Sequence, residues 1–463
     1  MTTSILSTGR MLDDDGRPQR TGTVWSACAH IITTAIGVGV LSLAWAMAQL
    51  GWVAGSLLFL FISATSLFTA TLLEDCYRSP DPVTGRRNYT YMEVVKSYLG
   101  GTMYKFCGFI LYTDLVAVSV GYSITAAKSM LAIQKSICRQ RSGGASSCRF
   151  SNIPHGLGFG IVQVVLSQIP NFHKLAWLSK LAALMSFGYA SIAIGLSIEK
   201  IISGPEGKTS LSGLHQAPSE KVWSIFTAAG DIALSYVFTV TVIEIQDTLK
   251  SSPPENKVMK KATKIGVMVM TILFILCGTL GYAAFGDEKV PENLMAGFLS
   301  QKAFWIVDLA NVFVVVHLVG AFQVFSQPVY RLIEVWAARR WPKSGFVTKE
   351  TAVSFGRVKF DVNMLRLSCR TGFVLLTTVI ATALPFFSDM LALLGAIGFW
   401  PLTIYFPLQL HIAQKKIQRA SLRWFGLQLL SVVCFLISVA AACGAVHGVH
   451  KGLKVNRPFQ FKE

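Results

Sequence analysis

Two glycines in the middle of an apolar stretch, Gly37 and Gly39, are the residues whose spacing most clearly suggests chemistry. The stretch runs from Thr23 to Gly51 and exceeds the length of about 20 residues that a helix needs to cross a bilayer. Glycine costs a helix interior about 1 kcal/mol relative to alanine, so the helix is weakest here. Lipid cannot satisfy freed backbone groups, so a break at this depth must line a cavity. The alternative is close helix packing through small residues.

A broken helix offers free N–H groups at one half-helix end and free C=O groups at the other. This pairing suits a zwitterion. The candidate binding residues in this stretch are Ile36, Gly37, Val38, Gly39, Val40 and Ser42.

Ionisable residues inside apolar stretches are the second group of candidate functional residues. A charge at the bilayer centre costs at least about 2.5–3.5 kcal/mol, so each such residue needs an explanation. They are His30, Asp114, Lys128, Lys180, Asp231, Glu244, Asp308 and His317. Extension to the membrane surface explains Lys128, Lys180 and Asp308 without a function. Glu244 suits a gate ion pair with a loop arginine. Proton coupling needs a group that changes charge, and the candidates are His30, Lys180, Asp231 and His317. For His317, a neutral ring satisfied by one carbonyl is the alternative.

Composition places these residues in a membrane protein. The 463 residues are 52% hydrophobic and 14% charged, against about 25% charged in soluble proteins. The net charge of +18 comes from Lys and Arg that lie between apolar runs, which argues against nucleic-acid binding. Residues 1–22 are polar, so we expect no removable signal peptide.

Apolar runs predict eleven membrane spans, at 23–49, 52–74, 103–132, 155–173, 176–198, 223–247, 262–285, 304–327, 367–387, 391–413 and 424–447. Lys and Arg are about twice as frequent in the segments on one side, which predicts a cytoplasmic N-terminus and an extracellular C-terminus. Cys138 and Cys148 then lie in one extracellular loop, where an oxidising compartment favours a disulfide.

The sixth span is also interrupted, by Gly230-Asp231 and by Ser235-Tyr236. Two five-helix units, 23–198 and 223–413, place the two interrupted spans at equivalent positions, which indicates a transport site at the bilayer midplane. The predicted organisation is a cytoplasmic tail at 1–22, a ten-helix core at 23–413, and an eleventh helix with an extracellular tail at 414–463.

No Walker loop, G-x-S-x-G, Cys-x-x-Cys or metal-binding spacing is present, which argues against an enzyme and favours a secondary transporter.

Several long stretches resemble the plant amino acid permeases of the amino acid/auxin permease superfamily: AHIITTAIGVGVLSLAWAMAQLGWVAG, DIALSYVFTVTVIEIQDTLKSSPPENKVMKKAT, NVFVVVHLVGAFQVFSQPVYRLIE, DCYRSPDPVTGRRNYTYMEVV and LALLGAIGFWPLTIYFPLQLHIAQKKIQR. The resemblance implies an all-α, five-plus-five inverted-repeat fold with broken helices 1 and 6. It also implies import of amino acids with protons at the plasma membrane, driven by the proton gradient without a cofactor. The backbone around Gly37 and Gly39 would receive the substrate carboxylate, opposite Ser235, Tyr236 and Phe238.

Several residues depart from the family pattern, including the sixth-helix run Leu234-Ser235-Tyr236-Val237-Phe238-Thr239, where F-A-Y-[small]-x-S is usual. Val38 stands where a small polar residue is usual, Asp114 where asparagine is expected, and Lys128 and Lys180 where apolar residues are usual. These departures predict an altered substrate range. The alternatives to an amino acid importer are a carrier of another small organic acid such as auxin, and a nutrient receptor that does not translocate its ligand.

Overall fold

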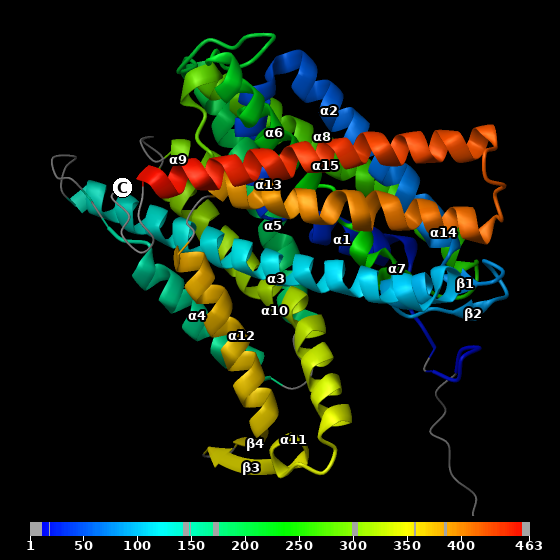
Figure 1. The fold of residues 1–463 in the computed structure, drawn as a ribbon. Coiled ribbons are helices and arrows are strands. Elements are labelled where there is room, and N and C mark those ends of the chain that lie inside the picture. Colours follow the sequence, from blue (N-terminus) through cyan, green and yellow to red (C-terminus); the bar gives the residue numbers. More distant parts are fainter. Residues whose placement is uncertain are drawn as a thin grey trace, which may run out of the picture.

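The computed structural model describes residues 12–17, 19–141, 148, 150–169, 176–298, 304–355, 358–383 and 387–455. The chain is almost entirely helical (Figure 1). The side chains of Val38 and Lys180, two of the predicted site residues, lie outside the described part.

The first span is broken where the glycines predict. Helix α1 (Val24–Ala35) begins after Thr23, whose hydroxyl accepts a hydrogen bond from the backbone N–H of Ser26. A short 3₁₀ turn, η1 (Val38–Leu41), follows the end of α1, and α2 (Leu43–Asp75) resumes the helix. Inside α2, Gly51 has a φ of 76°, which glycine adopts without the penalty of a side chain. This kink separates the first predicted span from the second.

A hairpin and a long helix come next. Strands β1 (Arg78–Ser79) and β2 (Arg86–Arg87) pair antiparallel. Helix α3 (Tyr91–Arg141) is interrupted at Gly100, where φ is 84°. The part before Gly100 forms a short helix that precedes the third predicted span. Helices α4 (Ile153–Ser167) and α5 (Ala176–Ser203) complete the first half.

The second half begins with another broken helix. It consists of α6 (Pro218–Leu234), η3 (Thr239–Thr241) and α7 (Val242–Gln246). The elements that follow are α8 (Glu255–Lys289), α9 (Leu294–Gly297), α10 (Phe304–Arg340), α11 (Gly345–Thr348), the antiparallel strands β3 (Glu350–Phe355) and β4 (Val358–Asn363), α12 (Met364–Ala383), α13 (Phe387–Gly398), the π-helical segment η4 (Phe399–Tyr405), α14 (Phe406–Gln414) and α15 (Leu422–Val455).

Within the described residues, nine helices are long and apolar enough to cross a membrane. The predicted spans at 23–49 and 155–173 correspond to shorter apolar helices, Val24–Ala35 and Ile153–Ser167. Helix length therefore does not confirm the count of eleven spans. The first of these helices is short because its span is broken, so one crossing is divided between two elements.

The long helices lie side by side, and the first and last described residues, 12 and 455, lie at opposite ends of the described part of the chain. In Figure 1, α3 (cyan), α13 with α14 (orange) and α15 (red) run together across the view. The β1–β2 hairpin lies at one end, which we call the hairpin end, and the last residues of α15 lie at the other. Residues of the N-terminal segment 12–22 form ion pairs with the hairpin.

Gly230 and Asp231 do not interrupt the sixth span, contrary to the sequence-based prediction, because both lie inside α6. A Cβ atom at Gly230 would lie 2.7 Å from the Cα atom of Ala392 in α13, and a Cβ atom at Gly395 would collide with the carbonyl oxygen of Gly230. The two glycines thus let α6 and α13 pack backbone to backbone, as small residues do between membrane helices. The break begins at Ser235, one turn later.

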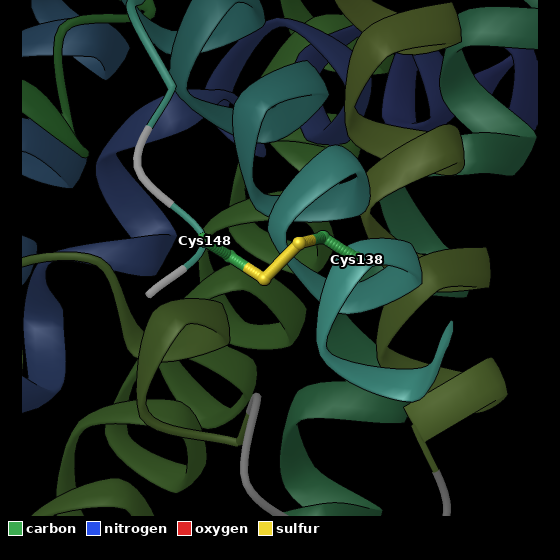
Figure 2. Close-up of a disulfide and its surroundings, with 2 residues drawn as sticks. All are labelled: Cys138 and Cys148. Carbon is green, nitrogen blue, oxygen red and sulfur yellow. A yellow bond between two sulfur atoms is a disulfide. The ribbon is translucent and has the colours of Figure 1, made fainter. Parts of the chain in front are cut away.

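The predicted disulfide between Cys138 and Cys148 is present (Figure 2). Cys138 lies in the last turns of α3, and Cys148 lies ten residues further along the chain. The bond ties the segment after α3 to the end of that helix.

We expect peptide mass spectrometry of the non-reduced protein to find Cys138 and Cys148 linked. Closing a loop of this length stabilises the local structure by about 2–3 kcal/mol at most, so replacement of both cysteines by serine lowers thermal stability but leaves the core folded. The wild-type protein after reduction, in which both thiols are released, is the control for thiol labelling. Labelling of both Cys138 and Cys148 by an impermeant reagent would contradict the pairing.

Candidate functional site

The two helix breaks meet in the protein interior. A Cβ atom at Gly39, in the first break, would lie 2.9 Å from Ser235 Oγ and 3.8 Å from the Leu234 side chain, where the second break begins. The predicted residues Ile36, Val40 and Ser42 are buried, as are Ser235, Tyr236 and Phe238. The fold therefore brings the two predicted sets of residues together, although they lie about 200 positions apart in the sequence.

Open space lies in front of Gly37. A Cβ atom at this position would have no atom within 4 Å, in contrast to Gly39. The carbonyl group of Gly37 accepts a hydrogen bond from the Tyr189 hydroxyl at 2.9 Å, and that of Gly39 accepts one from Ser42 Oγ at 3.0 Å. The carbonyl groups freed by the break thus have partners, and the space beside Gly37 is available to a ligand.

Tyr189 in α5 is a site residue that the sequence analysis did not single out. It is buried, and its ring packs edge-on to His317 of α10. A buried tyrosine hydroxyl usually finds a partner, so a tyrosine in an apolar span is a signal that a polar group lies nearby. Here the partner is the backbone of the first break.

We expect Tyr189→Phe to lower the uptake efficiency by a factor that corresponds to about 1–3 kcal/mol, because it leaves the Gly37 carbonyl without its partner. Kinetics of labelled-substrate uptake measure this effect. Tyr282→Phe is the matched control, since the Tyr282 hydroxyl contacts Ser210 and Asp287 instead. Equal effects of the two changes would show that Tyr189 acts only through general stability.

His317 has the bland environment that the sequence analysis offered as an alternative to a proton relay. Its Nδ1 atom lies 3.1 Å from the carbonyl oxygen of Ala182 and 2.7 Å from Ser186 Oγ. A neutral ring can donate from Nδ1 to that carbonyl, but its Nε2 atom is buried without a hydrogen-bond partner in the described part of the chain. His30 is exposed on α1, and the Lys180 side chain lies outside the described residues.

Asp231 is the proton-coupling candidate with the most unusual surroundings. The residue is 0% exposed, and neither carboxylate oxygen has a hydrogen-bond partner within the part of the chain that the structure describes. It lies in α6 one turn before the break, and its backbone carbonyl accepts a hydrogen bond from Ser235 Oγ at 3.3 Å. A carboxylate in this position is costly while it is charged, so it must be neutralised.

The side chains of the second break contact different neighbours. The Tyr236 hydroxyl donates to Thr271 Oγ1 of α8 at 3.1 Å, and the ring packs edge-on to Phe274. Thr239 Oγ1 lies 2.9 Å from Thr403 Oγ1 in the π-helical segment η4. The break is thus held on one side by α8 and on the other by η4.

The ion pair with an arginine at the end of the sixth span involves Asp247 rather than Glu244, which corrects the sequence-based prediction. Glu244 accepts a hydrogen bond from the backbone N–H of Tyr91 at 3.2 Å. Asp247, just after α7, pairs with Arg20 at 2.8 Å and with the Tyr77 hydroxyl at 2.6 Å. The arginine comes from the N-terminal segment, and only the folded chain places that segment against α7.

Arg20 belongs to a larger ion-pair cluster at the hairpin end. It also pairs with Asp13 at 2.9 Å and with Asp15 at 2.7 Å. The hydrogen bond from Arg20 holds the pKa of Asp15 well below its ordinary value. The stability contributed by this pair is therefore present at neutral pH and is lost only as the pH falls below the ordinary aspartate range. The cluster ties the N-terminal segment to the end of the sixth span.

A second cluster extends the first across the hairpin. Arg78 pairs with Glu255 at 2.8 Å, and Arg87 pairs with Asp14 at 2.5 Å and with Glu255 at 3.2 Å. The ion pairs therefore join the N-terminal segment, the β1–β2 hairpin and the start of α8. These elements contact one another on the hairpin side of the helix breaks.

The other charged residues inside predicted spans have ordinary partners or neighbours. Asp308 accepts a hydrogen bond from Ser136 Oγ at 2.9 Å, and Lys128 Nζ lies 5.4 Å from the centre of the Phe387 ring. Lys128 also lines a cavity of about 210 Å³ with Lys135, Glu292, Asn293 and Asn311. The cavity lies between α3, α10 and the segment before α9, away from the hairpin end.

Comparison with known proteins agrees with this geometry. The family model for transmembrane amino acid transporter proteins matches residues 20–450. Amino acid permease 8 of Arabidopsis thaliana is 51% identical over 456 residues, which cover 97% of this chain and 96% of that protein. Amino acid permease 6 of the same plant is 51% identical over 463 residues, with 98% and 96% covered. These relatives are named permeases, so they are transporters and not enzymes.

Solved structures support the fold. The crystal structure of MhsT in complex with L-phenylalanine has a TM-score of 0.53 at 12% identity and covers 93% of this chain and 100% of that chain. The inward facing conformation of Mhp1 also has a TM-score of 0.53, at 13% identity, with 98% and 96% covered. The chain is an all-α, multi-pass membrane protein of the five-plus-five inverted-repeat class with broken helices 1 and 6, and it belongs to the transmembrane amino acid transporter family.

Proposed function

We propose that this protein imports amino acids together with protons across the plasma membrane. The observation that carries the proposal is the meeting of the two helix breaks at Gly39 and Ser235, with open space in front of Gly37. Half-helix ends at one place offer donors to a carboxylate and acceptors to an ammonium group. The family membership makes an amino acid the natural zwitterion for this site.

Asp231 is the proton carrier in this proposal. A proton neutralises its carboxylate without any further ligand, and its position one turn before the second break couples protonation to the geometry of the substrate site. The ion-pair cluster around Arg20 and Asp247 holds the hairpin end closed while the site is loaded from the other side. This assignment makes the hairpin end and the N-terminus cytoplasmic, and the C-terminus and the disulfide extracellular.

Inward current under voltage clamp is the test. Cells that express the protein should show a current on addition of a neutral amino acid at acid pH, and the current should grow with substrate concentration and shrink as the external pH rises. Uptake of labelled amino acids and of indole acetic acid is measured in the same cells. Binding without current indicates a receptor, and uptake of indole acetic acid alone indicates an auxin carrier; either result overturns the proposal.

A further inference from the structure

Asp114, in the middle of α3, is a second buried carboxylate without a partner. The residue is 2% exposed, and its Oδ1 atom has no hydrogen-bond partner in the ranges that the structure describes. A buried carboxylate inside a membrane protein is normally paired with a cation or with several donors. Asp308 differs in that Ser136 donates to its Oδ2 atom, although its Oδ1 atom also lacks a partner within the described residues. The carboxylate of Asp114 therefore needs a group that its described neighbours do not supply.

Asp114 lies beside the second helix break. A Cβ atom at Gly398, the last residue of α13, would lie 3.0 Å from Asp114 Oδ1 and 2.9 Å from Val237 Cγ1. The carboxylate oxygen and the Val237 side chain thus lie within about 6 Å of one another. Val237 belongs to the unwound stretch between α6 and η3. Any side chain at position 398 would press against Asp114, so the glycine lets the backbone of α13 approach the buried carboxylate closely.

The unwound stretch that begins at Ser235 connects the first break with the neighbourhood of Asp114. Ser235 contacts Gly39, and Val237 is only two residues further along, at most about 7 Å in an extended chain. A ligand whose carboxylate and ammonium groups sit at the first break would need a long side chain to reach Asp114. Lysine and arginine have long side chains, and each ends in a cation.

A cationic side chain fits Asp114 better than a metal ion does. Hard cations take six or more oxygen ligands, and among the described residues no group of three or more His, Cys, Asp and Glu side chains is placed to hold a metal. An ammonium or guanidinium group needs only one carboxylate, and it forms short, strong, charge-assisted hydrogen bonds with it.

We propose that Asp114 binds the cationic side chain of a substrate and makes basic amino acids a preferred substrate class of this transporter. The inference rests on the proposed amino acid import and adds to it the residue that recognises the side chain. Asp231 keeps the proton and Asp114 receives the substrate cation, so the two unpartnered carboxylates have separate tasks.

The test compares lysine with leucine uptake in wild type and in Asp114→Asn, with the amount of protein at the cell surface measured by biotinylation. Loss of a charged hydrogen-bond partner should lower the ratio of lysine to leucine uptake by at least about tenfold, while leucine uptake persists. Asp114→Glu should retain part of the preference. Asp308→Asn is the matched control and should leave the ratio unchanged.

An unchanged ratio of lysine to leucine uptake in Asp114→Asn would overturn the inference. So would the loss of leucine uptake together with its acid dependence in this variant, because Asp114 would then be a proton carrier. Wild-type protein that carries leucine but neither lysine nor arginine would also overturn it. If Asp114→Asn does not reach the surface, competition in the wild type decides. Lysine should inhibit leucine uptake at least about tenfold more strongly than norleucine, its uncharged analogue, and equal inhibition would reject the site. Failure of the proposed amino acid transport can be distinguished from failure of the Asp114 assignment, because in the former case no amino acid produces uptake or current.

Discussion

Replacing Gly39 with leucine is expected to reduce amino acid uptake at least about 50-fold. The new Cβ atom would lie 2.9 Å from Ser235 Oγ, and the rest of the side chain would push the two breaks apart. Overpacking of a tight interior costs about 1–3 kcal/mol and occasionally more, and each 1.4 kcal/mol changes an equilibrium tenfold. Leucine also favours helix by nearly 1 kcal/mol over glycine, so the substitution rewinds the break. Uptake of labelled amino acid, normalised to surface protein, measures the loss.

Gly37→Leu should have the same functional result for a different reason. The position faces open space, so the side chain fits sterically and the protein should reach the membrane, but the leucine fills the volume that we assign to the substrate carboxylate. Gly195→Leu is the matched control, since Gly195 lies in the membrane-spanning helix α5 with nothing within 4 Å and is exposed. Normal uptake by either Gly37→Leu or Gly39→Leu would reject this location for the site.

A double substitution tests the contact between the breaks directly. Gly39→Ala alone should impair uptake, because even one methyl group meets Ser235 Oγ. Combining it with Ser235→Ala removes that oxygen and should restore part of the activity, as expected for residues in contact. Additive losses in the double variant would show that the two residues act independently.

The second large effect is expected for Asp231→Asn. Asparagine keeps the shape of the side chain but cannot take up or release a proton, so uptake should become independent of external pH and should no longer concentrate substrate against a gradient. Exchange of labelled for unlabelled substrate across proteoliposome membranes should continue, because exchange needs no net proton movement. The comparison of uptake at acid and neutral pH with exchange in the same preparation gives the result.

Asp308→Asn is again the suitable control, since Asp308 has a hydrogen-bond partner and lies away from the breaks. Its pH profile should match that of the wild type. A wild-type pH profile in Asp231→Asn would exclude Asp231 as the carrier and return His30, Lys180 and His317 to consideration. In His317, Nδ1 lies near the Ala182 carbonyl, but Nε2 is buried without a hydrogen-bond partner among the described residues.

Local sequence determined the first break, the kink at Gly51 and the membrane class. Glycine acts on the helix in which it lies, through its own backbone freedom, so Gly37 and Gly39 mark a weak point without reference to neighbours. The disulfide was predictable for a similar reason, since the two cysteines lie ten residues apart in one loop.

The repeat boundaries, 23–198 and 223–413, and the tail segments, 1–22 and 414–463, stay predictions.

Tertiary structure decided which residues from distant parts of the chain come into contact. Gly230 looks like a break in the sequence, but α13 packs against it and keeps that part of α6 helical. Glu244 and Asp247 are three residues apart and chemically alike, yet only Asp247 meets Arg20, because the N-terminal segment folds against the end of α7. Tyr189 reaches the first break only because α5 lies beside it. Each of these outcomes depends on contacts between segments far apart in the chain, and the energy of such a contact depends on both partners, so neither segment alone specifies it.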